Sequence, residues 1–195
     1  MFLSVVIQAG GQSRRMGQNK ALLPFKGQPL IQRVVDRVRL VADELLVTTN
    51  GPELYQFLNL PMFPDLLPGT GALGGLYTAL SAASNPLVAV IACDMPFVSA
   101  GLLEYERDLC GADWDVVIPR LDLGWEPMHA IYRRETCLPK IRKALEENQL
   151  RMDSWFGEVQ IRSLLEEEIR RIDPDLRSFH NINTPEEFKQ AEQLE

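Results

Sequence analysis

The apolar positions of the chain fall into two alternating patterns, short continuous runs and repeats with helical spacing. Segments 2–8, 44–50 and 86–94 are runs rich in β-branched residues, which predicts buried strands. After Pro29, apolar residues recur at i, i+3, i+4, i+7 intervals, which predicts an amphipathic helix carrying Ile31, Val34, Val35, Val38 and Val41. Strands that alternate with helices predict an α/β fold with a mostly parallel sheet, whose ligands gather at the carboxyl ends of the strands.

Weaker patterns extend this prediction along the chain. We expect a short helix over 52–58, an extended piece over 60–65, a helix over 72–84, strands over 114–119 and 128–132, helices over 135–148 and 151–165, and a strand or helix end over 167–173. Thr184, Pro185 and Glu187 match a capping box at the start of a final helix. Because no repeat, low-complexity tract or linker divides the sequence, we expect one domain over residues 1–195.

Composition limits the classes of function. A hydrophobic fraction of 46% and a charged fraction of 24% are ordinary for a globular protein, and the sequence offers neither a membrane helix nor a signal peptide. We therefore expect a cytoplasmic protein without a membrane partner. The net charge of -7 argues against nucleic-acid binding. The three cysteines are widely spaced and there are two histidines, so we expect free thiols and no zinc site.

The segment QAGGQSRRMGQNK, residues 8–20, departs from this acidic background. It follows the first predicted strand and contains three glycines and three cations. Glycine lets a backbone approach a ligand closely, and Arg and Lys attract anions, so the pattern favours a phosphate-binding loop over a solvated basic turn. It does not match a Walker A loop, because no hydroxyl residue follows Lys20.

Three further motifs could contribute to such a site. GTGALGG, residues 69–75, formally contains a dinucleotide fingerprint, but the preceding stretch is a proline-containing loop, which favours a turn or a glycine-rich loop beside a ligand. Asp94 follows the most apolar strand and could hold Mg²⁺ or cap the turn that Pro96 sets. Asn181 and Asn183 precede the capped helix and could be turn residues. A triphosphate held between the loop lysine and a cation on Asp94 suits nucleotidyl transfer.

Six motifs follow one another along the chain, namely AGGQSRRMGQNKALL, PD at 64–65, GALGGL, CDMPF, EPMHAIY and NINTPEEF. In this order they make the chain resemble the molybdenum cofactor guanylyltransferases, the molybdopterin-guanine dinucleotide biosynthesis protein A family. The resemblance extends over nearly the whole length of the chain. The resemblance implies a three-layer Rossmann-like nucleotidyltransferase fold. It also implies transfer of GMP from GTP to the terminal phosphate of molybdopterin carrying molybdenum, with Mg²⁺ required and pyrophosphate released. Proteins that deliver the pterin or accept the product would be transient partners.

The resemblance also implies roles for single residues. Arg15, Lys20 and Asp94 would be catalytic, with Asp94 as the metal ligand, and the nucleotide would be held by Gln8, Ala9, Gly10, Gly11, Lys20, Asn50, Asp65 and Asp94. Asn181 and Asn183 would lie on the pterin side. No general base is expected, because a phosphate monoester is already anionic near neutral pH.

The chain departs from the family pattern at three positions, with Gln8 in place of Leu, Asn19 in place of Asp and Ala72 in place of Pro. The alternatives left open are a cytidylyltransferase acting on the same pterin, a sugar- or polyol-phosphate nucleotidyltransferase, a GTP sensor without catalysis, and a nicotinamide oxidoreductase. The loop sequence Ala9-Gly10-Gly11 favours guanine, because relatives that use CTP tend to have a second alanine there.

Overall fold

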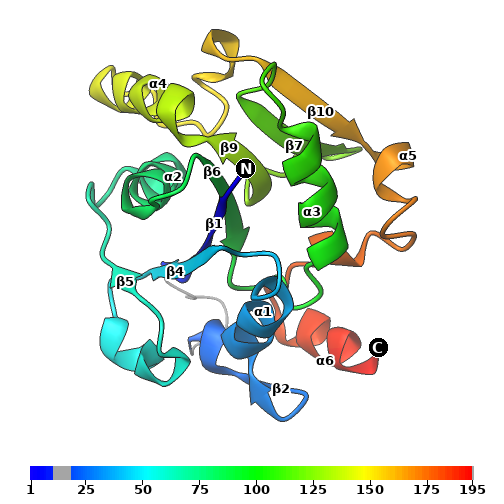
Figure 1. Cartoon of the computed structure of the whole chain (residues 1–195). Helices are drawn as coiled ribbons and strands as arrows, with labels where there is room; N and C mark the ends of the chain where they lie inside the picture. Colours follow the sequence, from blue (N-terminus) through cyan, green and yellow to red (C-terminus); the bar gives the residue numbers. More distant parts are fainter. Residues whose placement is uncertain (11–18, 195) are drawn as a thin grey trace.

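The computed structural model describes residues 1–10 and 19–194. In this part of the chain a central sheet has the strand order β10-β7-β9-β6-β1-β4-β5, with β8 paired to β7 (Figure 1). The strands are β1 Leu3–Gln8, β4 Glu44–Thr48, β5 Met62–Phe63, β6 Leu87–Ala92, β7 Val116–Leu121, β8 Gly124–Trp125, β9 His129–Arg133 and β10 Ile161–Leu165. A separate hairpin pairs β2, Pro24–Phe25, with β3, Gln28–Pro29. The predicted α/β fold with a mostly parallel sheet is confirmed.

The direction of the strands determines which ends meet. β1 lies between β4 and β6 and is parallel to both, so Gln8 aligns with Thr48 on one side and with Ala92 on the other. β9 runs antiparallel to β6 and β7. The carboxyl ends of β1, β4 and β6 therefore share one edge of the sheet with the amino end of β9.

Helices cover both faces of the sheet, as the alternating pattern predicts (Figure 1). Helices α1, Leu30–Val38, and α3, Ala100–Leu109, share one apolar cluster with Leu3, Val5 and Ile7 of β1. Helices α2, Gly71–Ala82, and α4, Arg134–Glu146, pack with Val6 on the opposite face. Because side chains alternate across a strand, Gln8 lies on the same face as Val6, beneath α2.

The C-terminal segment returns to the sheet edge at which β1 and β6 end. Helix α6, Pro185–Gln193, begins with the predicted capping box of Thr184 and Glu187 and packs through Ala191 and Phe188 against Phe25 of the hairpin. The backbone N–H of Ile182 donates to the carbonyl of Asp94 at 3.0 Å. This hydrogen bond places the segment 181–183 beside the turn that follows β6.

One prediction in the second half of the chain is wrong, and one pair of alternatives is decided. The helix expected over 151–165 is wrong: the 3₁₀ helix Phe156–Glu158 is followed by β10, which pairs in parallel with β7. The apolar positions suit either element, and the long-range pairing decides between them. The alternatives for 167–173 resolve into a short helix, α5, Glu166–Ile169. Helix α3, β8 and the β2–β3 hairpin were not anticipated.

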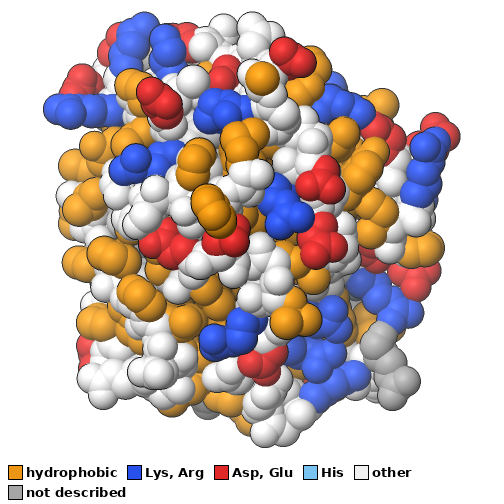
Figure 2. All heavy atoms as spheres, viewed as in Figure 1, with side chains coloured by type: hydrophobic (Ala, Val, Ile, Leu, Met, Phe, Trp, Pro, Cys, Tyr) orange, Lys and Arg blue, Asp and Glu red, His pale blue; other side chains and the backbone are white. Residues whose placement is uncertain are grey.

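The remaining elements are 3₁₀ helices, Lys20–Leu22, Pro52–Leu58 and Arg177–Phe179; the second replaces the short helix expected over 52–58. Acidic and basic side chains are interspersed over the face shown in Figure 2. Several large apolar side chains are exposed after β4, namely Leu54, Phe57, Phe63, Leu66 and Leu67. Among the described helices, none has the length and apolar character needed to cross a membrane.

Candidate active site

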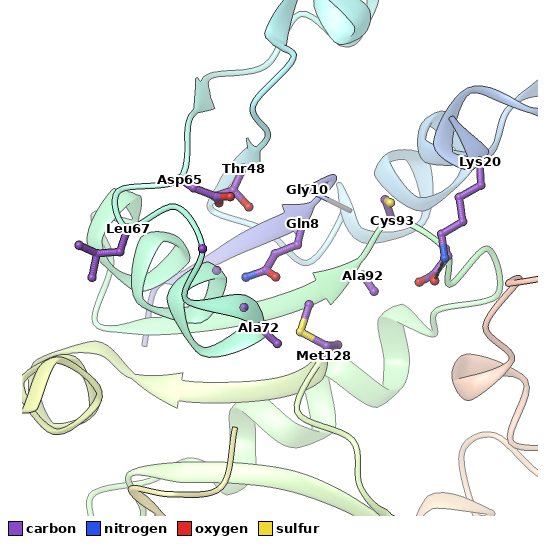
Figure 3. A pocket seen from close by; sticks show the side chains of 14 residues that line it. Gln8, Gly10, Lys20, Thr48, Asp65, Leu67, Ala72, Ala92, Cys93 and Met128 are labelled. Atoms are coloured by element: carbon purple, nitrogen blue, oxygen red, sulfur yellow. Dashed lines mark hydrogen bonds and ion pairs between the residues drawn. The ribbon is translucent and has the colours of Figure 1, made fainter. Parts of the chain in front are cut away.

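A cleft of about 670 Å³ opens at the sheet edge where β1, β4 and β6 end. One wall is the glycine-rich start of α2, and the opposite wall includes the first residues after β6. The lining residues are Gln8, Gly10, Lys20, Thr48, Asp65, Leu67, Gly69, Gly71, Ala72, Gly75, Ala92, Cys93, Asp94 and Met128. Figure 3 shows Lys20 at one end of this space, Leu67 and Asp65 toward the other, and Gln8 between them.

The lysine end of the cleft contains a cluster of charged and polar groups. The ammonium group of Lys20 forms an ion pair with Asp94 and donates to Oδ1 of Asn183 at 3.0 Å. The side chains of Lys20 and Asp94 retain 18% and 13% exposure, so both face the cleft rather than the core. Three residues from distant parts of the sequence therefore meet at one point.

Asn19 fixes the start of the 3₁₀ helix that carries Lys20. Its side-chain oxygen accepts from the backbone N–H of Ala21 at 3.2 Å, and its Nδ2 donates to the hydroxyl of the buried Tyr55 at 2.8 Å. A side-chain cap of this kind satisfies a helix-start donor and restricts the direction in which the next residue points. Asn19 is thus a positioning residue for Lys20, and its neutral amide donates to the tyrosine.

Asp94 lies two residues beyond the end of β6, in a turn closed by the 3.3 Å hydrogen bond from Met95 N–H to the carbonyl of Ala92. One carboxylate oxygen, Oδ2, contacts Lys20, while Oδ1 is buried and has no hydrogen-bond partner among the described residues. A carboxylate oxygen in this state is suited to a hard divalent cation. Among the described residues, no three His, Cys, Asp or Glu side chains lie together in a way that could hold a metal ion. Oxygens of phosphate and water would therefore complete the coordination shell of a cation bound to Asp94.

Gly10 and Asp65 join the cleft to a smaller pocket of about 390 Å³ that also contains Ala9 and Asn50. Asn50 donates to Oδ2 of Asp65 at 2.7 Å, and its Oδ1 accepts from the backbone N–H of Asp65 at 2.9 Å. A Cβ on Gly10 would lie 4.0 Å from both carboxylate oxygens of Asp65, in ordinary contact. The two hydrogen bonds hold the carboxylate at the border of the two spaces.

Cys93 lines the cleft beside Asp94. Burial, with a smaller contribution from the Asp94 charge, raises the pKa of its thiol to about 12. Because a thiol is nucleophilic only as the thiolate, Cys93 stays protonated and inert at neutral pH.

The structure brings most of the predicted site residues together. Five of them line the cleft, namely Gln8, Gly10, Lys20, Asp65 and Asp94, and Ala9 and Asn50 line the adjoining pocket. Asn183 reaches Lys20, whereas Asn181 is exposed in a separate cavity of about 630 Å³ that Asn183 also lines. Gly11 and Arg15 lie outside the described residues.

Thr48 and Met128 are among the lining residues to which the sequence analysis gave no role. Thr48 ends β4, and its position follows from its register with Gln8. Met128 precedes β9, and its carbonyl accepts from the backbone N–H of Ala92 at 3.2 Å. The strand ends signalled Thr48, but only the antiparallel direction of β9 brings Met128 to the same edge.

Comparisons with known proteins agree with this geometry. The MobA-like NTP transferase domain family matches residues 5–163. A molybdenum cofactor guanylyltransferase from Desulfosudis oleivorans is 35% identical over 188 residues, which cover 96% of this chain and 93% of that protein. A probable molybdenum cofactor guanylyltransferase from Natranaerobius thermophilus is 35% identical over 194 residues, covering 97% and 94%. The crystal structure of molybdopterin-guanine dinucleotide biosynthesis protein A from Archaeoglobus fulgidus superposes with a TM-score of 0.82 at 27% identity, covering 97% of each chain. The chain belongs to the MobA-like NTP transferase family.

Proposed function

We propose that this protein transfers GMP from GTP to the terminal phosphate of molybdopterin carrying molybdenum, forming the guanine dinucleotide cofactor and releasing pyrophosphate. The names of the relatives support the choice of guanine and of the pterin acceptor. The observation that carries the proposal is the meeting of Lys20, Asp94 and Asn183 at one end of the cleft. This arrangement offers a cation and a metal-binding oxygen to a triphosphate.

The roles of the protein groups follow from their charges. The ammonium group of Lys20 would neutralise charge on the triphosphate, and the two Asp94 oxygens would divide between that lysine and a divalent cation, for which we propose Mg²⁺. The cation, when bound, would stabilise the charge that develops on the phosphate oxygens and on departing pyrophosphate. Arg15 would add a second positive charge. The acceptor phosphate needs no general base, so positioning and charge neutralisation are sufficient.

The remaining predicted residues would form two groups, one binding GTP and the other binding the pterin. Gln8, Ala9, Gly10, Gly11, Asn50 and Asp65 would hold the nucleoside of GTP. Asn183 contacts Lys20 and also lines the cavity that contains Asn181, which supports the assignment of both asparagines to the pterin side. Because the 181–183 segment is hydrogen-bonded to Asp94, the two substrates would meet there. The same bond and the packing of α6 on the β2–β3 hairpin support our proposal of one domain over residues 1–195.

The test is pyrophosphate release from GTP, CTP, ATP or UTP in the presence of Mg²⁺, with and without the molybdenum-loaded pterin. We expect release with GTP that depends on the pterin. Turnover with CTP alone would identify a cytidylyltransferase. GTP binding without pyrophosphate release under any condition would identify a sensor and overturn the proposed function.

A further inference from the structure

We propose that the side chain of Gln8 recognises the nucleobase, by pairing its carboxamide with the O6 and N1–H edge of guanine. This inference rests on the proposed function for the orientation of the nucleotide, and it assigns base selectivity to a side chain rather than to backbone groups. Gln8 would be a specificity-determining residue. The evidence lies in where its backbone is held, what its side chain packs against and which of its atoms lacks a partner.

The backbone of Gln8 is fixed on both sides of the strand. Its carbonyl accepts from Cys93 N–H at 3.1 Å, and the next residue, Ala9, donates to the carbonyl of Thr48 at 2.9 Å. Gln8 is therefore held at the end of β1 by both neighbouring strands, β4 and β6. The direction in which the side chain leaves the sheet is set by the strand, so it projects toward α2.

Helix α2 has a glycine at the place where this side chain meets it. A Cβ on Gly75 would lie 3.0 Å from Oε1 and 3.3 Å from Nε2 of Gln8. A side chain on the helix at this position would crowd the carboxamide, and so Gly75 supports one wall of the recognition site. Figure 3 shows the Gln8 side chain in the space between β1, Ala72 of α2 and Met128.

Among the described residues, the carboxamide is not fully satisfied. Nε2 of Gln8 is buried and has no hydrogen-bond partner in this part of the chain. A buried amide donor without an acceptor is costly, by roughly 1–3 kcal/mol, and a turn of the carboxamide toward a ligand acceptor in the cleft would relieve this cost. Met128, Ala72 and Ala92, which line the same part of the cleft, have no polar side-chain group to offer.

The position of Gln8 relative to Lys20 determines which part of the nucleotide it meets. With the triphosphate at Lys20 and Asp94, the nucleoside extends toward Gln8 and α2, away from the charged end. Guanine presents the acceptor O6 next to the donor N1–H, and a carboxamide presents one donor group and one acceptor. Nε2 would donate to O6 and Oε1 would accept from N1–H.

The test compares nucleotides that differ only at the base edge. Inosine triphosphate keeps O6 and N1–H but lacks the 2-amino group. In contrast, 2-aminopurine riboside triphosphate keeps the 2-amino group and has neither O6 nor N1–H nor an amino group at C6, so a carboxamide in either orientation finds at most one partner. We expect Gln8→Leu to lower kcat/KM and binding affinity for GTP and for inosine triphosphate by a similar factor, roughly ten- to a hundredfold. Values for the 2-aminopurine nucleotide should change less than threefold.

A second variant keeps the inference testable if Gln8→Leu fails to fold. Gly75→Ala would press the new methyl group on the carboxamide and should reduce the preference for GTP over the 2-aminopurine nucleotide in the same direction. Gln56→Leu makes the same chemical change on an exposed 3₁₀ helix outside the cleft and should leave the selectivity unchanged.

Calorimetric binding and pyrophosphate release together separate the two proposals. If Gln8→Leu affects the three nucleotides equally, or none of them, the inference is wrong even where wild-type turnover of GTP upholds the proposed function. If Gln8-dependent selectivity appears in binding while no acceptor yields pyrophosphate, the proposed function is wrong and the inference holds. Failure of the wild-type protein to bind any of the nucleotides would overturn both.

Discussion

Two charged pairs in this protein differ in their surroundings, although both lie near the ends of neighbouring strands. Lys20 and Asp94 meet at the cleft, where both side chains are partly exposed and Lys20 has a second partner in Asn183. Glu106 of α3 and Nδ1 of His129 on β9 lie 3.3 Å apart and both side chains are 0% exposed. The first pair can be reached from the cleft without unfolding, and the second pair cannot.

The two pairs also differ in what remains unsatisfied. At the cleft, Oδ1 of Asp94 is buried and has no hydrogen-bond partner among the described residues, and the residue lines a space that a ligand can enter. In the core, the contact between Glu106 and His129 lacks hydrogen-bond alignment, and neither carboxylate oxygen has another donor among the described residues. Polarity at the cleft therefore serves binding, whereas polarity in the core lowers stability unless both charges are present.

The largest effect should follow from removal of the Asp94 carboxylate. Asp94→Ala should lower pyrophosphate release by roughly 10³-fold or more, because the proposed cation, which would stabilise the developing charge on phosphate, would lose its carboxylate ligand. The midpoint of thermal unfolding should not fall, since Lys20 can turn to Asn183 and solvent. Asp122→Ala, which removes an exposed carboxylate elsewhere, is the control. Retention of more than a tenth of the activity by Asp94→Ala would remove Asp94 from the catalytic role.

Breaking the buried pair of Glu106 and His129 should lower stability and leave activity unchanged. At pH 6, Glu106→Gln should lower the free energy of unfolding by about 3 kcal/mol, because the imidazolium of His129 loses its counter-charge in the core. Measured in urea, this loss should be mostly recovered when both residues are replaced by leucine, while kcat of the folded protein stays within twofold of wild type. A single variant as stable as wild type would show that the pair carries no net charge interaction.

Loss of the cleft lysine should affect substrate binding more than folding. Lys20→Ala should raise KM for GTP by roughly ten- to a hundredfold, in line with the loss of a charge-assisted hydrogen bond to phosphate. Affinity for guanosine should be unchanged, because the nucleoside would not reach this end of the cleft in the proposed orientation. Lys189→Ala removes an exposed lysine of α6 and serves as the control. Equal losses for guanosine and GTP would contradict the phosphate assignment.

A smaller loss is expected at Asn19, which acts on the cleft pair through Lys20. Asn19→Ala should lower kcat/KM about fivefold, because removal of a side-chain cap costs about 1 kcal/mol and Lys20 loses its fixed starting point. Asn19→Asp keeps the capping oxygen and can accept from Tyr55, so it should recover most of the loss. If Asn19→Ala were fully active, the cap would have no part in positioning the lysine.

The sequence revealed the cleft pair more readily than the buried one. Lys20 and Asp94 each follow a strongly apolar strand, and parallel strands bring such positions to one edge. Glu106 interrupts the apolar stripe of α3, and its partner His129 lies on β9, which is antiparallel to β6. That contact depends on helix packing and strand direction, and neither is encoded in the local pattern around Glu106.

The same distinction applies to the remaining elements. β6 was predicted from its continuous apolar sequence, and five of its residues are buried in the structure. β10 has only one buried residue, Leu164, and forms a strand because it pairs with β7. The packing of Gln8 against Gly75 is likewise a tertiary contact between two segments that are far apart in the sequence. Sequence periodicity therefore predicts the layers and the strand ends, and tertiary contacts decide which side chains meet there.

The smallest expected effect is a pH dependence of stability that comes from the buried pair. Burial by itself lowers the pKa of His129, but the negative charges of Glu106 and Glu126 outweigh it and raise the pKa above the usual value. Burial raises the pKa of Glu106 as well, so both shifts make the folded protein hold protons more tightly than the unfolded chain. The contribution of His129 should be complete below about pH 6.5 and decline as pH rises through its folded-state pKa, by at most about 1.4 kcal/mol per pH unit. The raised pKa of Glu106 adds a decline in the same direction, which begins above about pH 4.3, the pKa of a glutamate in the unfolded chain.

Urea unfolding from pH 6 to pH 9 measures this contribution as the stability of wild type minus that of the Glu106→Leu/His129→Leu double variant. The subtraction removes titrating groups that both proteins share, the cleft pair among them. A difference that shrinks toward alkaline pH is expected. A difference that stays constant or grows would mean that His129 is neutral in the folded protein at pH 6, and the contrast between an exchangeable ion pair in the cleft and a fixed one in the core would then be wrong.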